Sequence, residues 1–132
     1  MIAFAIIYFS TIFTETTMIA TVTRQQLADK IRTGKTVILE ALPEKYFADA
    51  HLPGARNLPH DRVEQLAAQI APDRDADIVV YCANLQCRNS HLAAHALAGL
   101  GYRNVAVYAE GKKDWIEAGL PVERGSSLAQ AA

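Results

Sequence analysis

The sequence predicts an α/β fold in which a mostly parallel sheet carries helices on both faces. Helical and strand patterns alternate along the chain, which is typical of this fold class. The 132 residues are enough for one domain with a sizeable hydrophobic core. A hydrophobic content of 51% also excludes an intrinsically disordered chain.

The first predicted element is a helix over residues 24–33. Thr23 and Gln26 form a capping box at its start, and Gly34 is suited to end it. Residues 36–42 then form a short apolar run between Gly34 and a proline, which is typical of a buried strand.

The alternation continues in the second half of the chain. Residues 77–81 carry the strongest strand signal, because three β-branched residues precede a tyrosine. Ser90 is a suitable N-cap for the next helix, which Gly99 and Gly101 end. The other predicted elements are a loop-rich stretch over 43–59, a helix over 61–70, a strand over 105–108 and a helix over 112–118.

The N-terminal segment differs from the rest. Residues 1–14 are almost wholly apolar, but they are shorter than the ~20 residues that span a bilayer. They also lack the basic region and small-residue cleavage site of a secretory signal, whereas Met18 precedes an ordinary domain start. A peripheral apolar helix that docks on a partner or membrane surface remains the alternative. The predicted organisation is an extension over 1–17 outside the fold, one domain over 18–124 and a flexible tail over 125–132.

Charge and cysteine content exclude several classes of protein. The 13 basic and 14 acidic side chains leave a net charge of −1, so no nucleic-acid partner is expected. Membrane association is not expected either. Two cysteines are too few for the disulfide framework of a secreted domain, and we expect a cytoplasmic protein. The sequence does not indicate an oligomeric state.

Cys82 is the candidate nucleophile. It follows the predicted strand 77–81 and precedes a loop that leads into a helix, which is where ligand sites of α/β sheets lie. Backbone N–H groups and the helix dipole are expected to converge on its sulfur. Together with Arg88, they predict a pKa below the ~8.5 of a free thiol. The alternative is a buried cysteine that acts only as a small apolar side chain.

Three segments of the chain resemble the rhodanese-like domain over residues 22–122. They are the VVYC of 79–82, the helix pattern S-x-x-A-A-x-x-L from Ser90 with the following G-Y-x-x-V, and the HLPGARNLP of 51–59. The resemblance implies a three-layer α/β/α sandwich on a five-stranded, mostly parallel sheet. It also implies a transferase that moves sulfur through a persulfide on the active cysteine.

The resemblance assigns roles to individual residues. Cys82 would carry the persulfide, and the loop backbone would bind the substrate anion through convergent N–H groups. The implied substrate-binding residues are Ala83, Asn84, Leu85, Gln86, Arg88 and Asn89. Neither a cofactor nor a metal is expected.

The chain departs from the family pattern in four places. Ser90 lies eight residues after Cys82 rather than six, and no glycine intervenes. A frequent Asp-x-Arg is replaced by residues 40–42 (EAL), the paired glycines before the last helix by 110–111 (EG), and the glycine before a histidine by Ala50. These departures bear on thiosulfate as the substrate more than on the fold.

The longer loop leaves a different enzyme class open. Cys82 and Arg88 also form the Cys-x5-Arg pattern of tyrosine phosphatases and arsenate reductases, in which the guanidinium binds two oxygens of the oxyanion. The loop lacks the small residues that let such a loop curl tightly, and Leu85 and Gln86 are poor substitutes.

Cys87 is the second catalytic candidate. Its thiol could attack the Cys82 persulfide and release the transferred sulfur as a disulfide forms. A loop residue without a role is the alternative. A metal site that also uses His51 and His91 is a further alternative, which the absence of a Cys-x-x-Cys spacing disfavours.

The remaining histidines and two lysines have simpler predicted roles. His91 and His95 are expected to form a solvent-facing polar stripe, and His51 to be a structural residue of a Pro-Gly turn. Lys112 and Lys113 are candidates for a positive rim at the mouth of the site.

The predicted function is therefore a sulfurtransferase. Cys82 is expected to take sulfane sulfur from a small sulfur-donor anion, thiosulfate or a persulfide, and to pass it to a thiol or cyanide acceptor. A noncatalytic rhodanese-like module that binds a partner or senses redox state through its cysteines is the alternative of a different class.

Overall fold

The computed structural model of the chain describes residues 19–126. The predicted extension 1–17 and most of the predicted tail lie outside the described residues. Five parallel strands form one sheet in the order β1-β5-β4-β2-β3. The strands are β1 (Ala20–Thr21), β2 (Val37–Glu40), β3 (Arg56–Asn57), β4 (Asp77–Tyr81) and β5 (Asn104–Tyr108), and the helices are α2 (Arg24–Thr33), α3 (Glu44–Asp49), α4 (Val63–Ile70), α5 (Asn89–Gly99) and α6 (Gly111–Glu117).

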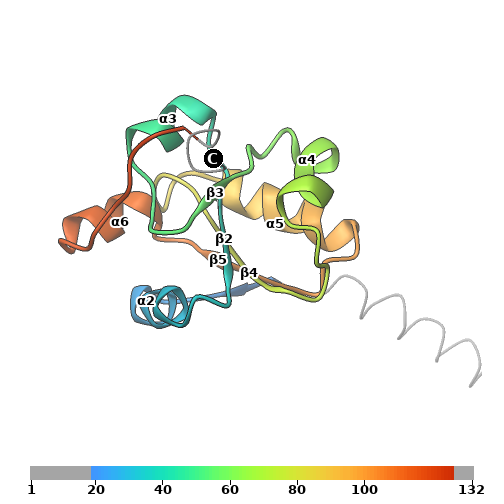
Figure 1. Ribbon diagram of the computed structural model, residues 1–132, viewed down its shortest axis with the longest axis horizontal. Coiled ribbons are helices and arrows are strands. Elements are labelled where there is room, and N and C mark those ends of the chain that lie inside the picture. Colours follow the sequence, from blue (N-terminus) through green and yellow to red (C-terminus); the bar gives the residue numbers. More distant parts are fainter. Residues whose placement is uncertain (1–18, 127–132) are drawn as a thin grey trace, which may run out of the picture.

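The helices cover both faces of the sheet, which confirms the predicted three-layer α/β/α sandwich. Helices α4 and α5 lie on one face, and α2, α3 and α6 lie on the other (Figure 1). Each face has its own core cluster: Val63, Ala67 and Leu97 pack on the first, and Leu27 and Trp115 pack on the second. The central strand β4 is buried from both sides along Ile78 to Tyr81.

Local sequence signals account for α2. The Thr23 side chain accepts a hydrogen bond from the Gln26 N–H, and the Gln26 side chain accepts one from the Thr23 N–H, so the predicted capping box is present. Gly34 ends the helix in the left-handed conformation with φ of 73°. The bounds of this helix are those that the sequence predicts.

Two sequence predictions are wrong at helix starts. The predicted helix 61–70 begins at Val63, where Arg62 precedes it without a side-chain cap. Ser90 is not an N-cap, because α5 already begins at Asn89. Its side chain instead faces the Cys82 sulfur, with Oγ 3.3 Å from Sγ.

The stretch 43–59 is more ordered than the predicted loop. It contains α3 and the two-residue strand β3, whose residues pair with Leu39 and Glu40 of β2. Such short elements carry no readable hydrophobic period, because their positions are decided by pairing with residues that are distant in sequence.

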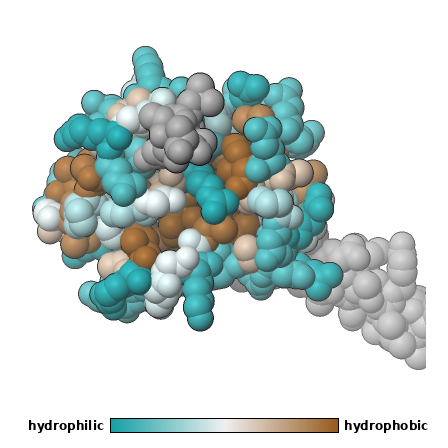
Figure 2. Space-filling view, viewed as in Figure 1, coloured by the Kyte–Doolittle hydropathy of each residue, from teal (hydrophilic) through white to brown (hydrophobic). Residues whose placement is uncertain are grey.

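The surface of the described part is mixed in polarity. In the view of Figure 1, Figure 2 shows hydrophobic residues across the middle of the face and hydrophilic residues around its margin. Within residues 19–126, no helix is both long and apolar enough to cross a membrane.

Candidate active site

Cys82 lies at the carboxyl end of the central strand, as the sequence predicts. It follows Tyr81, the last residue of β4, and the loop 83–88 connects it to α5. The residue is 1% exposed, and its thiol donates a hydrogen bond to the carbonyl oxygen of Cys87 over 3.3 Å. The hydroxyl of Ser90 in the first turn of α5 lies at the same distance from the sulfur. The loop therefore closes over the sulfur.

The predicted low pKa of Cys82 is wrong. Burial raises the pKa of the Cys82 thiol above its ordinary value, and the Cys87 side chain raises it further. Hydrogen bonds from the side chain and the backbone N–H of Ser90 act in the opposite direction but do not outweigh burial. Arg88 is exposed and is not among the causes of the shift. The resting thiol is therefore protonated at neutral pH.

Asn84 organises the tip of the loop. Its side-chain oxygen Oδ1 accepts hydrogen bonds from the backbone N–H groups of Gln86 and Cys87, over 3.1 and 3.0 Å. The Cys87 N–H also approaches the backbone oxygen of Asn84, at 3.2 Å. Two N–H groups of the predicted anion cradle are thus engaged within the loop, and the loop itself presents the carbonyl oxygen of Cys87 to the Cys82 sulfur. The assignment of the loop as substrate-binding remains a prediction.

Helix α6 holds the base of the loop. The N–H of Lys112 donates to the carbonyl of Cys82 over 2.8 Å, and the N–H of Lys113 donates to that of Ala83 over 2.9 Å. Gly111, with φ of 77°, lets the two backbones approach this closely. A Cβ at this position would lie 2.7 Å from the Asn84 nitrogen and 2.8 Å from the Cys82 oxygen. This contact requires glycine.

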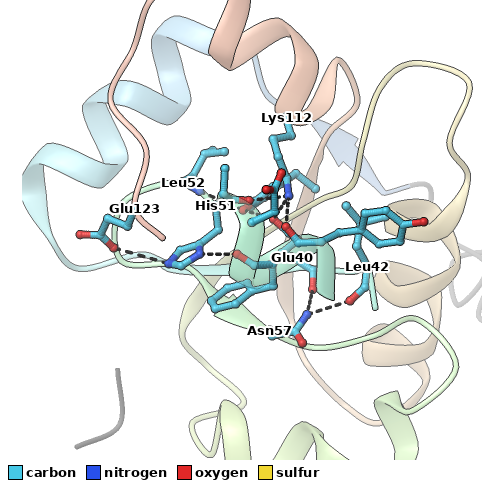
Figure 3. A network of polar contacts seen from close by, with 12 residues as sticks. Glu40, Leu42, His51, Leu52, Asn57, Lys112 and Glu123 are labelled. Atoms are coloured by element: carbon cyan, nitrogen blue, oxygen red, sulfur yellow. Dashed lines mark hydrogen bonds and ion pairs between the residues drawn. The ribbon is translucent and has the colours of Figure 1, made fainter. Parts of the chain in front are cut away.

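A buried ion pair lies beneath the same contact (Figure 3). The Lys112 ammonium is 2.9 Å from Oε1 of Glu40 and donates to the carbonyl oxygens of Tyr46 and Ala50, over 2.9 and 2.5 Å. The side chain of Lys112 is 12% exposed, so its prediction as a rim cation is wrong, whereas Lys113 is exposed. Glu40 thus forms its ion pair with a lysine of α6. The chain has Leu42 where the rhodanese-like pattern frequently has the arginine of Asp-x-Arg.

Glu40 connects this ion pair to the strand that precedes Cys82. The Tyr81 hydroxyl donates to Oε1 of Glu40 over 2.7 Å, and the Leu52 N–H donates to the Tyr81 oxygen. Glu40 is fully buried, and within residues 19–126 its Oε2 has no hydrogen-bond partner. Burial raises the pKa of Glu40, although Lys112 and Tyr81 lower it. Burial and Glu40 also raise the pKa of Tyr81.

His51 has a structural role, as predicted. Its ring is buried and stacks on Phe47 with centroids 3.7 Å apart, and Nδ1 lies 2.7 Å from the Phe47 carbonyl oxygen. Its backbone forms a bridge with Glu123, whose carboxylate lies 3.8 Å from Nε2 (Figure 3). His95 is exposed and His91 is half-buried on α5. Within residues 19–126, no group of three or more His, Cys, Asp or Glu side chains is arranged to hold a metal ion.

Sequence reasoning missed three contributors to the site. Glu40 and Gly111 were noted only as departures from the family pattern, and Lys112 only as a surface charge. The available signal was that an acidic residue ends one central strand while a Gly-Lys pair starts a helix after another. Only the parallel register, which pairs Glu40 with Tyr81 and Tyr81 with Tyr108, brings these positions to one edge.

The fold and site define a class of α/β domain in which a cysteine ends the central strand and a short loop leads from it to a helix. The family model described as Rhodanese-like domain matches residues 23–118, and the chain belongs to this family. Solved structures similar to this chain include one named thiosulfate sulfurtransferase.

The proteins similar to this chain carry different names. Over 107 residues the chain is 30% identical to the HTH-type transcriptional regulator Rv0324 of Mycobacterium tuberculosis, covering 81% of this chain and 46% of the regulator. The crystal structure of thiosulfate sulfurtransferase from Pseudomonas aeruginosa is 32% identical with a TM-score of 0.70, covering 81% of this chain and 20% of that one. A structure titled rhodanese with anions from E. coli is 28% identical with a TM-score of 0.57, covering 68% and 99%. The chain thus spans about half of the regulator and one fifth of the Pseudomonas enzyme.

Proposed function

We propose that this chain is a sulfurtransferase domain in which Cys82 carries sulfane sulfur as a persulfide. The observation that carries the proposal is the place of Cys82. It stands at the carboxyl end of β4 in a domain of the rhodanese-like family, and the Ser90 side chain and N–H of α5 interact with its sulfur. These two groups are donors that can stabilise a negative charge on the outer sulfur of a persulfide.

The proposed reaction has two displacements. The Cys82 thiolate attacks the outer sulfur of a donor, the sulfur–sulfur bond of the donor breaks, and sulfite leaves from thiosulfate or a thiol leaves from a persulfide. A thiol or cyanide acceptor then attacks the outer sulfur of the Cys82 persulfide and regenerates the Cys82 thiolate. Because Cys82 is 1% exposed, the loop 83–88 has to move before either reactant reaches the sulfur.

Cys87 is the proposed resolving thiol. Its side chain raises the pKa of Cys82, which indicates that the two thiols interact, and both are free. Attack of the Cys87 thiolate on the inner sulfur would form a Cys82–Cys87 disulfide and release hydrosulfide, which takes up a proton. An external dithiol would then reduce the disulfide and become oxidised itself.

Mass spectrometry after incubation with thiosulfate, or with glutathione persulfide, tests the carrier role. We expect a mass increase of one sulfur atom on Cys82, and none on the Cys82→Ser variant. An unmodified Cys82 with both donors contradicts the proposal. In the Cys87→Ser variant the adduct should persist until a thiol is added, whereas equal decay in the two proteins contradicts the resolving role.

A second candidate is a noncatalytic module that senses redox state. Two observations favour it: the related Rv0324 is named a transcriptional regulator, and the free thiols of Cys82 and Cys87 lie in the same loop segment. Titration with a thiol/disulfide buffer distinguishes the two functions. A sensor should form the Cys82–Cys87 disulfide reversibly without turning over a sulfur donor, and continued turnover contradicts it.

A further inference from the structure

We propose that Asn84 is a specificity-determining residue that selects small-molecule persulfides over donors with an oxyanion head, such as thiosulfate. The inference rests on the proposed persulfide chemistry of Cys82 and assigns the class of its donor. It follows from where the hydrogen-bond donors and the positive charges around the loop are directed.

The first argument concerns the N–H groups of the loop. The oxygens of the thiosulfate dianion require several convergent donors, and the loop backbone is their nearest source. Two of these donors, the N–H groups of Gln86 and Cys87, are held by the Asn84 side chain at 3.1 and 3.0 Å. An oxyanion would have to displace the Asn84 oxygen to gain these hydrogen bonds.

The second argument concerns the sulfur itself. The carbonyl oxygen of Cys87 lies 3.3 Å from Sγ of Cys82, so the loop presents the negative end of a peptide dipole to the reacting atom. Favourable donors come from the hydroxyl and N–H of Ser90. A persulfide adds one outer sulfur with at most one charge, whereas thiosulfate brings two charges and three oxygens into the same space.

The third argument concerns cations. The Lys112 ammonium is buried against Glu40 and two carbonyl oxygens, so its charge is already compensated. Arg88 is exposed at the start of α5. Neither residue lowers the pKa of Cys82, which would fall if a cation lay close to the sulfur. The surroundings of the sulfur therefore favour a donor that brings little charge and no oxyanion head to the reacting atom.

The loading step needs no component beyond the donor. The Cys82 thiol loses its proton and attacks the outer sulfur of a donor R–S–SH. The R–S–SH sulfur–sulfur bond breaks as the Cys82–sulfur bond forms, and R–S⁻ takes up the proton and leaves as a thiol. No net oxidation occurs, because one sulfane sulfur is exchanged between two thiols.

The test compares Asn84→Ala with wild type, using thiosulfate and glutathione persulfide as the two donors. The rate of sulfur loading on Cys82 is followed by mass spectrometry. Wild type should load faster from glutathione persulfide. Removing the Asn84 carboxamide frees the Gln86 N–H and leaves the Cys87 N–H only its longer contact with the Asn84 backbone oxygen. Loading from thiosulfate should therefore rise about tenfold, while loading from the persulfide changes less than about twofold. Asn104→Ala, which removes the same carboxamide at an exposed position at the start of β5, on the sheet edge away from Cys82, is the matched control and should change neither rate.

Two results overturn the inference. One is a wild-type protein that loads faster from thiosulfate, and the other is an Asn84→Ala variant with an unchanged ratio of the two rates. If neither donor loads Cys82 in any variant, the proposed sulfur transfer is wrong. The role of Asn84 is then tested by measuring thiosulfate binding instead of sulfur loading. Calorimetric titration should then show tighter thiosulfate binding to Cys82→Ser/Asn84→Ala than to Cys82→Ser, and equal binding contradicts the role.

Discussion

The base of the Cys82 loop, residues 82–83, is held by another helix, whereas its tip is held by contacts within the loop. Two N–H groups of α6 bind the carbonyls of Cys82 and Ala83 at the base, and Gly111 packs against their backbone. The tip, residues 84–88, is organised by the Asn84 side chain from within the loop. The difference indicates that the rest of the fold fixes where the sulfur stands, whereas hydrogen bonds within the loop itself hold the tip.

The base has a further support that the tip lacks. The Lys112 side chain extends from the same residue that binds the Cys82 carbonyl and reaches the buried Glu40 at the end of β2. The tip exposes Leu85, which is 64% accessible. Substitutions at the base are therefore expected to affect the stability of the whole domain, and substitutions at the tip mainly its reactivity.

Lys112→Met should have the largest effect. It leaves the fully buried Glu40 without its cation, and breaking a buried ion pair in this way costs about 3–5 kcal/mol of unfolding free energy. Urea denaturation measures the loss. Lys113→Met, at the exposed neighbouring position, should lose less than about 0.5 kcal/mol. Equal losses in the two variants would show that the buried pair does not support the base.

Gly111→Ala should follow, with a loss of about 3 kcal/mol, because its Cβ meets backbone atoms and its φ is positive. Gly119→Ala is the matched control: its φ of +75° is similar, but no atom lies within 4 Å of the added Cβ. It should lose only about 1 kcal/mol. Chemical denaturation of both variants separates contact from backbone strain, and similar midpoints would contradict the close approach at the base.

The pH dependence of Cys82 alkylation tests the junction between base and tip. The pKa of this thiol is raised above its ordinary value, so the thiolate fraction keeps increasing as the pH rises through that value. In the Cys87→Ser variant, where burial remains, the iodoacetamide rate should keep rising with pH at pH values where the rate for the unfolded protein already levels off. The urea-unfolded protein provides the reference, and a plateau near neutral pH in the folded protein would contradict the raised pKa.

Leu85→Ala should have the smallest effect. The side chain is exposed at the tip, so the unfolding free energy should change by less than about 0.5 kcal/mol. Thermal unfolding provides the measurement. A loss comparable to that of Gly111→Ala would show that the tip is part of the cooperative core and would remove the contrast with the base.

Much of the fold could be predicted because its signals are local. The capping box and Gly34 determine α2, and the β-branched run over 77–81 determines the central strand. The place of Cys82 follows from that strand and the helix after it. The elements α3 and β3 could not be predicted from the sequence. The position of β3 is set by its pairing with β2 and not by a local hydrophobic pattern.

The sequence by itself determined the α/β class, the family and the cysteine at the end of the central strand, because periodicity, capping and motif spacing are properties of neighbouring residues. Tertiary structure alone decided the chemistry around that cysteine. Burial raised the pKa of the Cys82 thiol, and the parallel register brought Glu40 into contact with Lys112. Desolvation and ion pairing depend on which distant residues come into contact, and that contact exists only once the sheet has formed.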